Sequence, residues 1–132
     1  MTATLSDRLE ELARRVEALD GDDWQTRYDI ASAFGWSQKQ VGQVIAWYAP
    51  GDPFMKAGPP KWLTSIDAAM TLVPRGYCVS AMGEVPDDLD WYVNLWRDGD
   101  DEGEPEVRAK TAPLAICSAA LRALATLQDG GE

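Results

Sequence analysis

The sequence predicts an α+β fold in which a small three-stranded antiparallel sheet lies sandwiched between helical layers. Short β-rich segments separated by turns occupy residues 77–110. Helical hydrophobic patterns flank them on both sides, and the most apolar of these spans residues 111–127. We therefore expect an α-β-β-β-α unit over residues 64–127, preceded by a Pro/Gly-rich loop over 49–63 and two N-terminal helices, all in a single domain, 1–132.

Residues 1–48 are predicted to form an N-terminal helical layer. The first helix is amphipathic, since apolar residues recur on one helical face: Leu5, Leu9, Leu12, Val16 and Leu19. Asp22 or Asp23 can cap a second helix over about residues 24–34. Residues 37–48 fit either a helix that begins at Ser37 or a strand over 44–48 that follows a turn at Gly42.

A short helix and three strands are predicted inside the α-β-β-β-α unit, over residues 64–73, 77–82, 90–97 and 106–110. The second of these strands carries large apolar groups on both faces, because Trp91, Val93 and Leu95 alternate with Tyr92 and Trp96. We therefore expect helices over both faces of the sheet. The short helix and the final helix would cover one face, and the N-terminal helices would cover the other.

The final helix is expected to form the centre of the core. Thr111 can cap its first turn, and Pro113 fits there because its missing N–H is not needed. Apolar residues recur at intervals of three and four positions: Leu114, Cys117, Leu121 and Leu124. Alanines fill most other positions, and Arg122 is the only charge between Thr111 and Leu127. Such a helix needs burial on much of its circumference.

Charge and composition exclude several classes of function. The chain has 22 acidic and 12 basic residues, a net charge of −10, and residues 63–132 carry −8 of it. This acidic half would repel a phosphate backbone, so nucleic acid is an unfavourable partner. The chain has no histidine, which excludes Ser-His-Asp and Cys-His sites, and its two cysteines match no metal-ligand spacing. We expect no catalytic residues, no metal and no cofactor.

Sequence features also predict the location of the protein. No apolar run reaches the roughly 20 residues that a membrane-spanning helix needs, and the N-terminus has no signal-peptide pattern. Cys78 and Cys117 lie far apart within apolar patterns, which is typical of reduced, buried thiols in a cytosolic protein. We therefore predict a cytoplasmic protein with no membrane partner. A homo-oligomer is compatible with these features, since a small sheet has edges to cover.

One acidic turn resembles a calcium-binding loop. Residues 98–103 place carboxylates at alternate positions and a glycine at the sixth. The twelfth position of such a loop supplies a bidentate Glu, and here it is Ala109. We interpret the segment as a solvated hairpin turn.

Residues 27–48 carry the spacing of a helix-turn-helix. Ala31 would pack on the second helix, Gly35 would form the turn, and Val41 and Val44 would anchor a recognition helix. That helix would expose side chains suited to phosphates and base edges: Gln38, Lys39, Gln40 and Gln43. A DNA-binding regulator is therefore the alternative function, although few Arg or Lys residues surround the segment.

Four aromatic residues gather around the Pro/Gly-rich loop: Trp36, Trp47, Tyr48 and Trp62. They could wall a pocket for a flat ligand or form a protein-binding surface. They could equally fill a second layer of the core. The sequence leaves these interpretations open, and the four residues are its candidates for ligand or partner binding.

The segments over residues 64–76 and 109–123, together with the Trp-containing strand, resemble the phage ABA (α-β-α) sandwich domain family of small phage and prophage proteins. Residues 30–36 are similar to an upstream element of such proteins, so the resemblance covers most of residues 27–125. It implies a three-layer fold and a strand or loop after the second helix. It brings no catalytic residues.

We therefore predict a non-enzymatic phage or prophage accessory protein that acts by binding in the host cytoplasm. Its partner would be a host protein or a small metabolite such as a nucleotide. The acidic, histidine-free composition and the aromatic-rich loop motivate this prediction.

Overall fold

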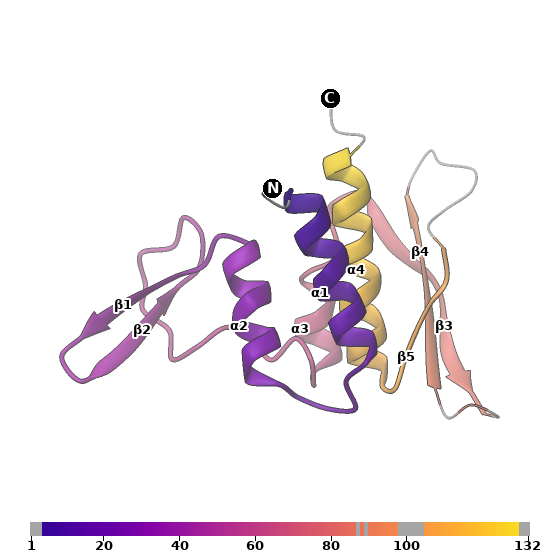
Figure 1. Ribbon diagram of the computed structural model, residues 1–132, viewed down its shortest axis with the longest axis horizontal. Helices are drawn as coiled ribbons and strands as arrows, with labels where there is room; N and C mark the ends of the chain where they lie inside the picture. The colour runs from indigo at the N-terminus through magenta and orange to yellow at the C-terminus, as the bar shows by residue number, and fades with distance from the viewer. Residues whose placement is uncertain (1–3, 87, 89, 98–104, 130–132) are drawn as a thin grey trace.

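The computed structural model describes residues 4–86, 88, 90–97 and 105–129 (Figure 1). This part of the chain confirms the α+β class, with helices, a three-stranded antiparallel sheet and a separate two-stranded sheet. The helices are α1 (Leu5–Glu17), α2 (Trp24–Ala33), α3 (Ile66–Met70) and α4 (Ala112–Asp129). The strands are β1 (Ser37–Val41), β2 (Val44–Tyr48), β3 (Tyr77–Val85), β4 (Asp90–Arg97) and β5 (Val107–Ala109). The predicted acidic turn over 98–103 lies outside the described residues.

The first two helices begin at capping residues. At α1, the backbone N–H of Asp7 donates to Thr4 Oγ1 at 3.1 Å, and the N–H of Thr4 donates to Asp7 Oδ2 at 3.3 Å. At α2, the N–H of Thr26 donates to Asp23 Oδ2 at 3.0 Å. The Thr26 hydroxyl and N–H together hold the pKa of Asp23 below its ordinary value. Both helix starts therefore follow from the local sequence.

Helix α4 is the centre of the fold, as its sequence predicts. The residues from Leu114 to Leu121 are all buried. Helix α1 packs antiparallel along α4, because the Ser6 hydroxyl donates to the Ala125 carbonyl at 3.3 Å and the hydroxyl of Ser118 donates to the carboxylate of Glu17. The short helix α3 also packs on α4.

A buried thiol ties α4 to the chain that precedes α3. The Cys117 thiol donates to the carbonyl oxygen of Trp62 at 2.9 Å. Burial raises the pKa of this thiol to about 12. Cys78, by contrast, is exposed on β3, so the prediction of a buried thiol is wrong at this position. The two cysteines therefore occupy different environments.

The three-stranded sheet has the order β3-β4-β5, and its central strand keeps the predicted bounds of 90–97. One face lies against α4 and buries Val93, Leu95, Val107 and Ala109. The β3–β4 ladder contains a bulge between Val79 and Ala81.

The prediction that the N-terminal helices cover the second face of this sheet is wrong. Helices α1 and α2 lie on the far side of α4, so the order along the long axis is sheet, α4, α1 and α2 (Figure 1). Within the described residues, no helix covers the face that carries Tyr92 and Trp96. Helix α3 also packs on α4 rather than on the sheet. The α-β-α layering that the resemblance implies is therefore not the arrangement of these elements.

The N-terminal helical layer is predicted over residues 1–48, but its last helix, α2, ends at Ala33. Helix α2 stops at Phe34, and Gly35 follows with φ +88°, a value that glycine adopts without strain. Residues 37–48 then form an antiparallel β1–β2 hairpin. Gly42, with φ +65°, takes the first position of its two-residue turn. This outcome agrees with the strand or loop that the resemblance implies after the second helix.

Candidate interaction surfaces

The β1–β2 hairpin and the loop after it form a projection that we call the arm, residues 37–56 (Figure 1). Its register runs from Ser37 opposite Tyr48 to Val41 opposite Val44. The loop returns along the other edge of β2. There the Trp47 N–H donates to the Lys56 carbonyl at 3.0 Å, and the Lys56 N–H donates back at 2.8 Å. This bridge places the loop beside the hairpin.

Asp52 organises the loop of the arm. Its Oδ1 accepts the N–H of Phe54 at 2.9 Å, and its Oδ2 lies 3.2 Å from Lys56 Nζ. The Phe54 N–H, followed by the Lys56 ammonium group, holds the pKa of Asp52 below its ordinary value. Asp52 thereby fixes the turn that presents the neighbouring apolar residues.

The arm exposes a set of large apolar side chains. They are Val41 (46% exposed), Val44 (63%), Ile45 (54%), Phe54 (74%) and Met55 (60%). The helix interpretation turned Val41 and Val44 inward, and the structure corrects it. The sequence does carry a signal for this surface, because residues 35–58 contain one carboxylate and two lysines in a chain of net charge −10. Val41 and Val44 lie on one face of the hairpin and Ile45 on the other, because neighbouring residues of a strand point to opposite faces. The arm therefore exposes apolar side chains on both of its faces.

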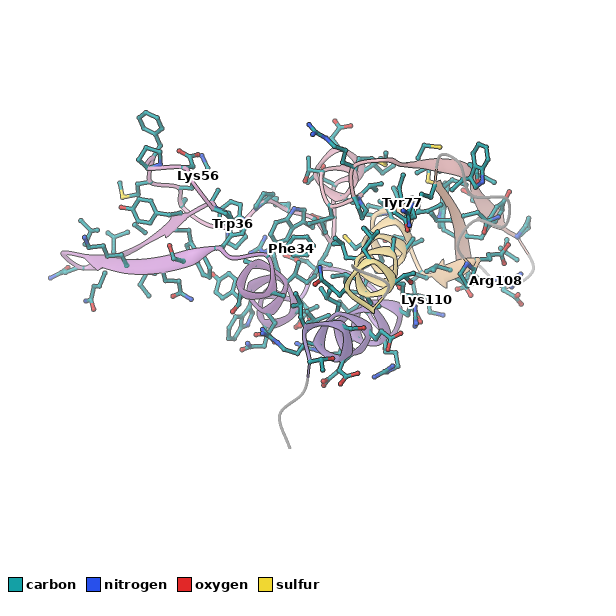
Figure 2. The ribbon with its side chains drawn as sticks, turned by 90° about the horizontal axis from the view of Figure 1, so that it is seen from above. Phe34, Trp36, Lys56, Tyr77, Arg108 and Lys110 are labelled. Carbon is teal, nitrogen blue, oxygen red and sulfur yellow. The ribbon has the colours of Figure 1, made fainter. Side chains whose placement is uncertain are left out.

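Two aromatic contacts hold the base of the arm against the body. The Trp47 ring lies 4.8 Å from the Tyr28 ring of α2, centroid to centroid. The Trp36 and Trp62 rings lie 6.0 Å apart at an interplanar angle of 86°. Figure 2 shows Trp36 and Phe34 between the arm and the helices.

The structure gives different surroundings to the four aromatic candidates. Trp47 and Trp62 are 4% and 2% exposed, so both belong to the core. Trp36 and Tyr48 are half-buried. The two ring pairs place Trp47 against α2 and Trp36 against Trp62, which is the arrangement of a second core layer.

A hollow of about 200 Å³ lies beside Trp36 and Trp62. Its lining residues are Phe34, Trp36, Pro50, Pro60, Trp62, Thr71 and Leu72. Ligand pockets occupy about 300–1,000 Å³. The indole N–H of Trp62 is buried and has no hydrogen-bond partner among the described residues. The hollow is therefore small for a flat organic ligand.

The helix-turn-helix prediction is wrong, because its recognition segment is the β1–β2 hairpin. Gln38, Lys39, Gln40 and Gln43 are all exposed on that hairpin. Strand alternation puts Gln38 and Gln40 on one face of β1 and Lys39 on the other. The Gln40 amide donates to the carbonyl of Gly42 at 3.3 Å, close to the turn. The four side chains therefore do not share a helical surface.

A larger hollow, about 440 Å³, lies between α1, α4 and β5. Arg122 lines it and donates to Glu17, from Nε to Oε2 at 2.8 Å and from Nη2 to Oε1 at 3.1 Å. Arg108 also lines it, and its Nε lies 3.0 Å from Glu106 Oε2. Both guanidinium groups are thus bound to carboxylates of the chain. An anionic ligand would have to displace them.

The sheet face turned away from α4, which we call the outer face, differs from the buried one. Strand alternation and register assign it these residues: Cys78, Ala81, Gly83, Val85, Asp90, Tyr92, Asn94, Trp96 and Arg108. Trp96 is 42% exposed. Tyr92 lies across Gly83, because its Cε1 is 3.1 Å from the position that a Cβ at residue 83 would take. The outer face is therefore partly apolar.

None of the helices in the described ranges has both the length and the apolarity that crossing a bilayer requires. Across the same residues, no three Cys, Asp or Glu side chains gather in a group that could hold a metal ion. No protein-family model, no curated protein and no solved structure matches the chain. The interaction surfaces are therefore interpreted from their own geometry.

Proposed function

We propose that this chain is a non-enzymatic binding protein that docks onto another protein through its arm. The observation that carries the proposal is the exposure of five large apolar side chains on a projecting part of the fold. Full burial of one such side chain contributes roughly 1.5–3 kcal/mol. Because the five side chains are 46–74% exposed, a partner that covers all of them gains a free energy comparable with the lower part of the cost of association, which is about 4–15 kcal/mol.

A protein partner is better supported than a small metabolite. The aromatic-lined hollow of about 200 Å³ falls short of an ordinary ligand pocket. The larger hollow is lined by Arg108 and Arg122, whose guanidinium groups already bind carboxylates. The arm, in contrast, offers apolar side chains together with the hydrogen-bonding edge of β1.

The biological setting in the proposal comes from the sequence resemblance to phage ABA sandwich proteins alone. In that setting the chain is a phage or prophage accessory protein in the cytoplasm of the host, and the arm docks onto a host protein. The net charge of −10 favours a protein partner over nucleic acid. The setting and the partner are parts of the proposal.

Site-specific photo-crosslinking tests the proposal. A photoreactive amino acid replaces Phe54 on the arm or, as a matched control, the exposed residue Arg14 on α1. We expect crosslinks to another protein from position 54 and none to that protein from position 14. The doubly substituted V44S/I45S protein should lose the crosslink at position 54. Equal crosslinking from both positions, or none from the arm, contradicts the proposal.

A further inference from the structure

We infer that the outer edge of β1 accepts an extended segment of the partner protein as an added antiparallel strand, and that this segment carries a carboxylate. This inference rests on the proposed function, because it names the kind of partner segment that the arm binds. In recognition of this type, backbone hydrogen bonds supply affinity and the neighbouring side chains supply specificity.

The two edges of the β1–β2 hairpin differ. The outer edge of β2 is closed by its own chain, since the N–H and the carbonyl group of Trp47 both bond to Lys56. The outer edge of β1 has no strand beside it within the described residues, and all five residues from Ser37 to Val41 are exposed. The edge of β1 is therefore the one that remains for another chain.

The backbone groups on this edge belong to Gln38 and Gln40. Successive residues of an antiparallel strand turn their N–H and carbonyl groups alternately toward the strands on either side. Trp47 turns its groups away from β1, so Gln38, its partner in the register, turns its own away from β2. Gln40 follows two residues later and does the same. Among the described residues, no turn, loop or cap hydrogen bond satisfies these four backbone groups.

The side chains of β1 define the chemistry of the added segment. Lys39 and Val41 share one face of the strand, and both are exposed. Lys39 forms no ion pair with any residue in the described part of the chain. Toward an added strand, Lys39 and Val41 occupy the positions without backbone hydrogen bonds, where opposite side chains approach most closely. A carboxylate opposite Lys39 and an apolar side chain opposite Val41 are the complement of this face.

The direction of the added strand gives the order of these two residues. An antiparallel strand runs opposite to β1, so its residue facing Val41 precedes its residue facing Lys39 by two positions. The complementary segment therefore reads apolar-x-acidic. The residue x lies opposite Gln40 and exchanges backbone hydrogen bonds with it.

A second copy of β1 is a poor occupant of this edge. The register that uses both outward residues of each strand pairs Gln38 of one copy with Gln40 of the other. That register places Lys39 opposite Lys39, and like charges directly opposite each other are destabilising. A shifted register avoids this contact but leaves one outward residue of each strand without a partner. The edge therefore favours an acidic segment of another protein.

Titration of the full-length protein with a capped peptide, Thr-Thr-Ile-Thr-Glu-Thr-Thr, tests the inference by amide NMR. We expect the amide resonances of Gln38 and Gln40 to shift and their hydrogen exchange to slow. The Lys39 amide faces Ala46 inside the hairpin, so its exchange rate should stay the same. A matched peptide with Lys in place of Glu should bind about threefold more weakly.

A matched pair of variants separates the backbone edge from the side chain. Gln38→Pro removes an outward N–H that the hairpin does not use, and an edge strand tolerates such a proline. Gln38→Ala shortens the same side chain but keeps the N–H. We expect the proline variant to bind the peptide about fivefold more weakly than the alanine variant. Circular dichroism and the NMR spectrum verify the fold, and where Gln38→Pro disrupts the arm, Gln40→Pro and Gln40→Ala replace the pair.

A charge reversal tests the acidic preference. Lys39→Glu should bind the Lys peptide more tightly than the Glu peptide, because the attractive pair is then restored with opposite signs. Three outcomes overturn the inference: no binding at millimolar peptide, equal binding by the proline and alanine variants, and a charge preference that Lys39→Glu leaves unchanged.

The proposed function is judged separately by crosslinks from position 54 to another protein. If those crosslinks form and the peptide does not bind, the arm keeps its docking role and strand addition is excluded. If the peptide binds as expected and no crosslinks form, the edge of β1 is a binding site and docking through the exposed apolar side chains is excluded.

Discussion

Arg122 and Glu17 form a two-pronged ion pair across the α1–α4 interface, with N···O distances of 2.8 and 3.1 Å. The Glu17 hydrogen bonds raise the pKa of Arg122 above its ordinary value. The same carboxylate accepts the hydroxyl hydrogen of Ser118, whose side chain is buried. The Glu17 carboxylate of α1 thus accepts hydrogen bonds from both Ser118 and Arg122 of α4.

Replacement of Glu17 by alanine should destabilise the protein. The substitution leaves the buried hydroxyl of Ser118 without its acceptor, and an unsatisfied buried polar group costs about 1–3 kcal/mol. We expect the free energy of unfolding, measured by urea titration, to fall by about 2 kcal/mol. Glu11→Ala is the control, because Glu11 is exposed on the same helix. Equal effects of the two substitutions would contradict this role for Glu17.

Truncation of Leu121 should have a larger effect. Leu121 is fully buried on α4, and Leu→Ala substitutions at such sites cost about 2–5 kcal/mol. We expect a loss of about 3 kcal/mol in the free energy of unfolding. Gln128→Ala, at an exposed position of the same helix, should change it by less than about 0.5 kcal/mol. A small effect at Leu121 would mean that α4 is not the centre of the core.

Substitution of Gly42 should disturb the arm and spare the body. Gly42 has φ +65°, and a Cβ placed there would have no neighbour within 4 Å, so the expected cost is conformational. Alanine in this region costs about 1–2 kcal/mol. For Gly42→Ala, amide hydrogen exchange should accelerate in β1 and β2 and remain unchanged in α4. Gly42→Asn should be milder, since asparagine tolerates this conformation. Equal exchange in wild type and Gly42→Ala would exclude a strained turn.

The loop of the arm should respond to acid. The pKa of Asp52 is lower in the folded protein than its ordinary value of 3.8. Its stabilising contribution is therefore fully present above about pH 4 and is lost as the pH falls through the folded pKa. We expect the Phe54 amide resonance in NMR spectra to shift, and its exchange protection to fall, below pH 4. Asp52→Ala should remove this transition. An unchanged transition in that variant would assign it to another group.

The sequence predicts a helix or a strand well where the apolar residues follow a single spacing. The spacing of the apolar residues from Leu5 to Leu19 fits a helix and no other structure, and α1 forms there. Strand β4 has the predicted bounds because its flanking turns and alternating aromatics agree. The hairpin was ambiguous because Val41, Val44 and Ile45 satisfy the spacing of a helix as well as that of a two-residue turn. The positive φ of Gly42 distinguishes the two structures and is not visible in hydrophobic periodicity.

The candidate surfaces were harder to predict for a different reason. Large apolar residues indicate burial, but the sequence does not state whether the cover comes from the same chain. Trp47 and Trp62 are covered by their own chain, whereas Phe54 and Trp96 remain exposed. The apolar pattern of β4 therefore led to a helical layer that this face lacks in the described residues. Charge was the better guide, because the stretch around the arm is poor in carboxylates.

The two cysteines differ in exposure, so Cys78 can serve as a chemical probe that the protein already carries. Cys117 is buried with a pKa of about 12, so at neutral pH it remains a protonated thiol that alkylating reagents do not reach. Cys78 lies exposed on the outer face, opposite Trp96 in the β3–β4 ladder. Maleimides should therefore label the native chain at one position. Because that position lies on the outer face, the labelling rate of the unmodified protein measures how accessible that face is at a given concentration.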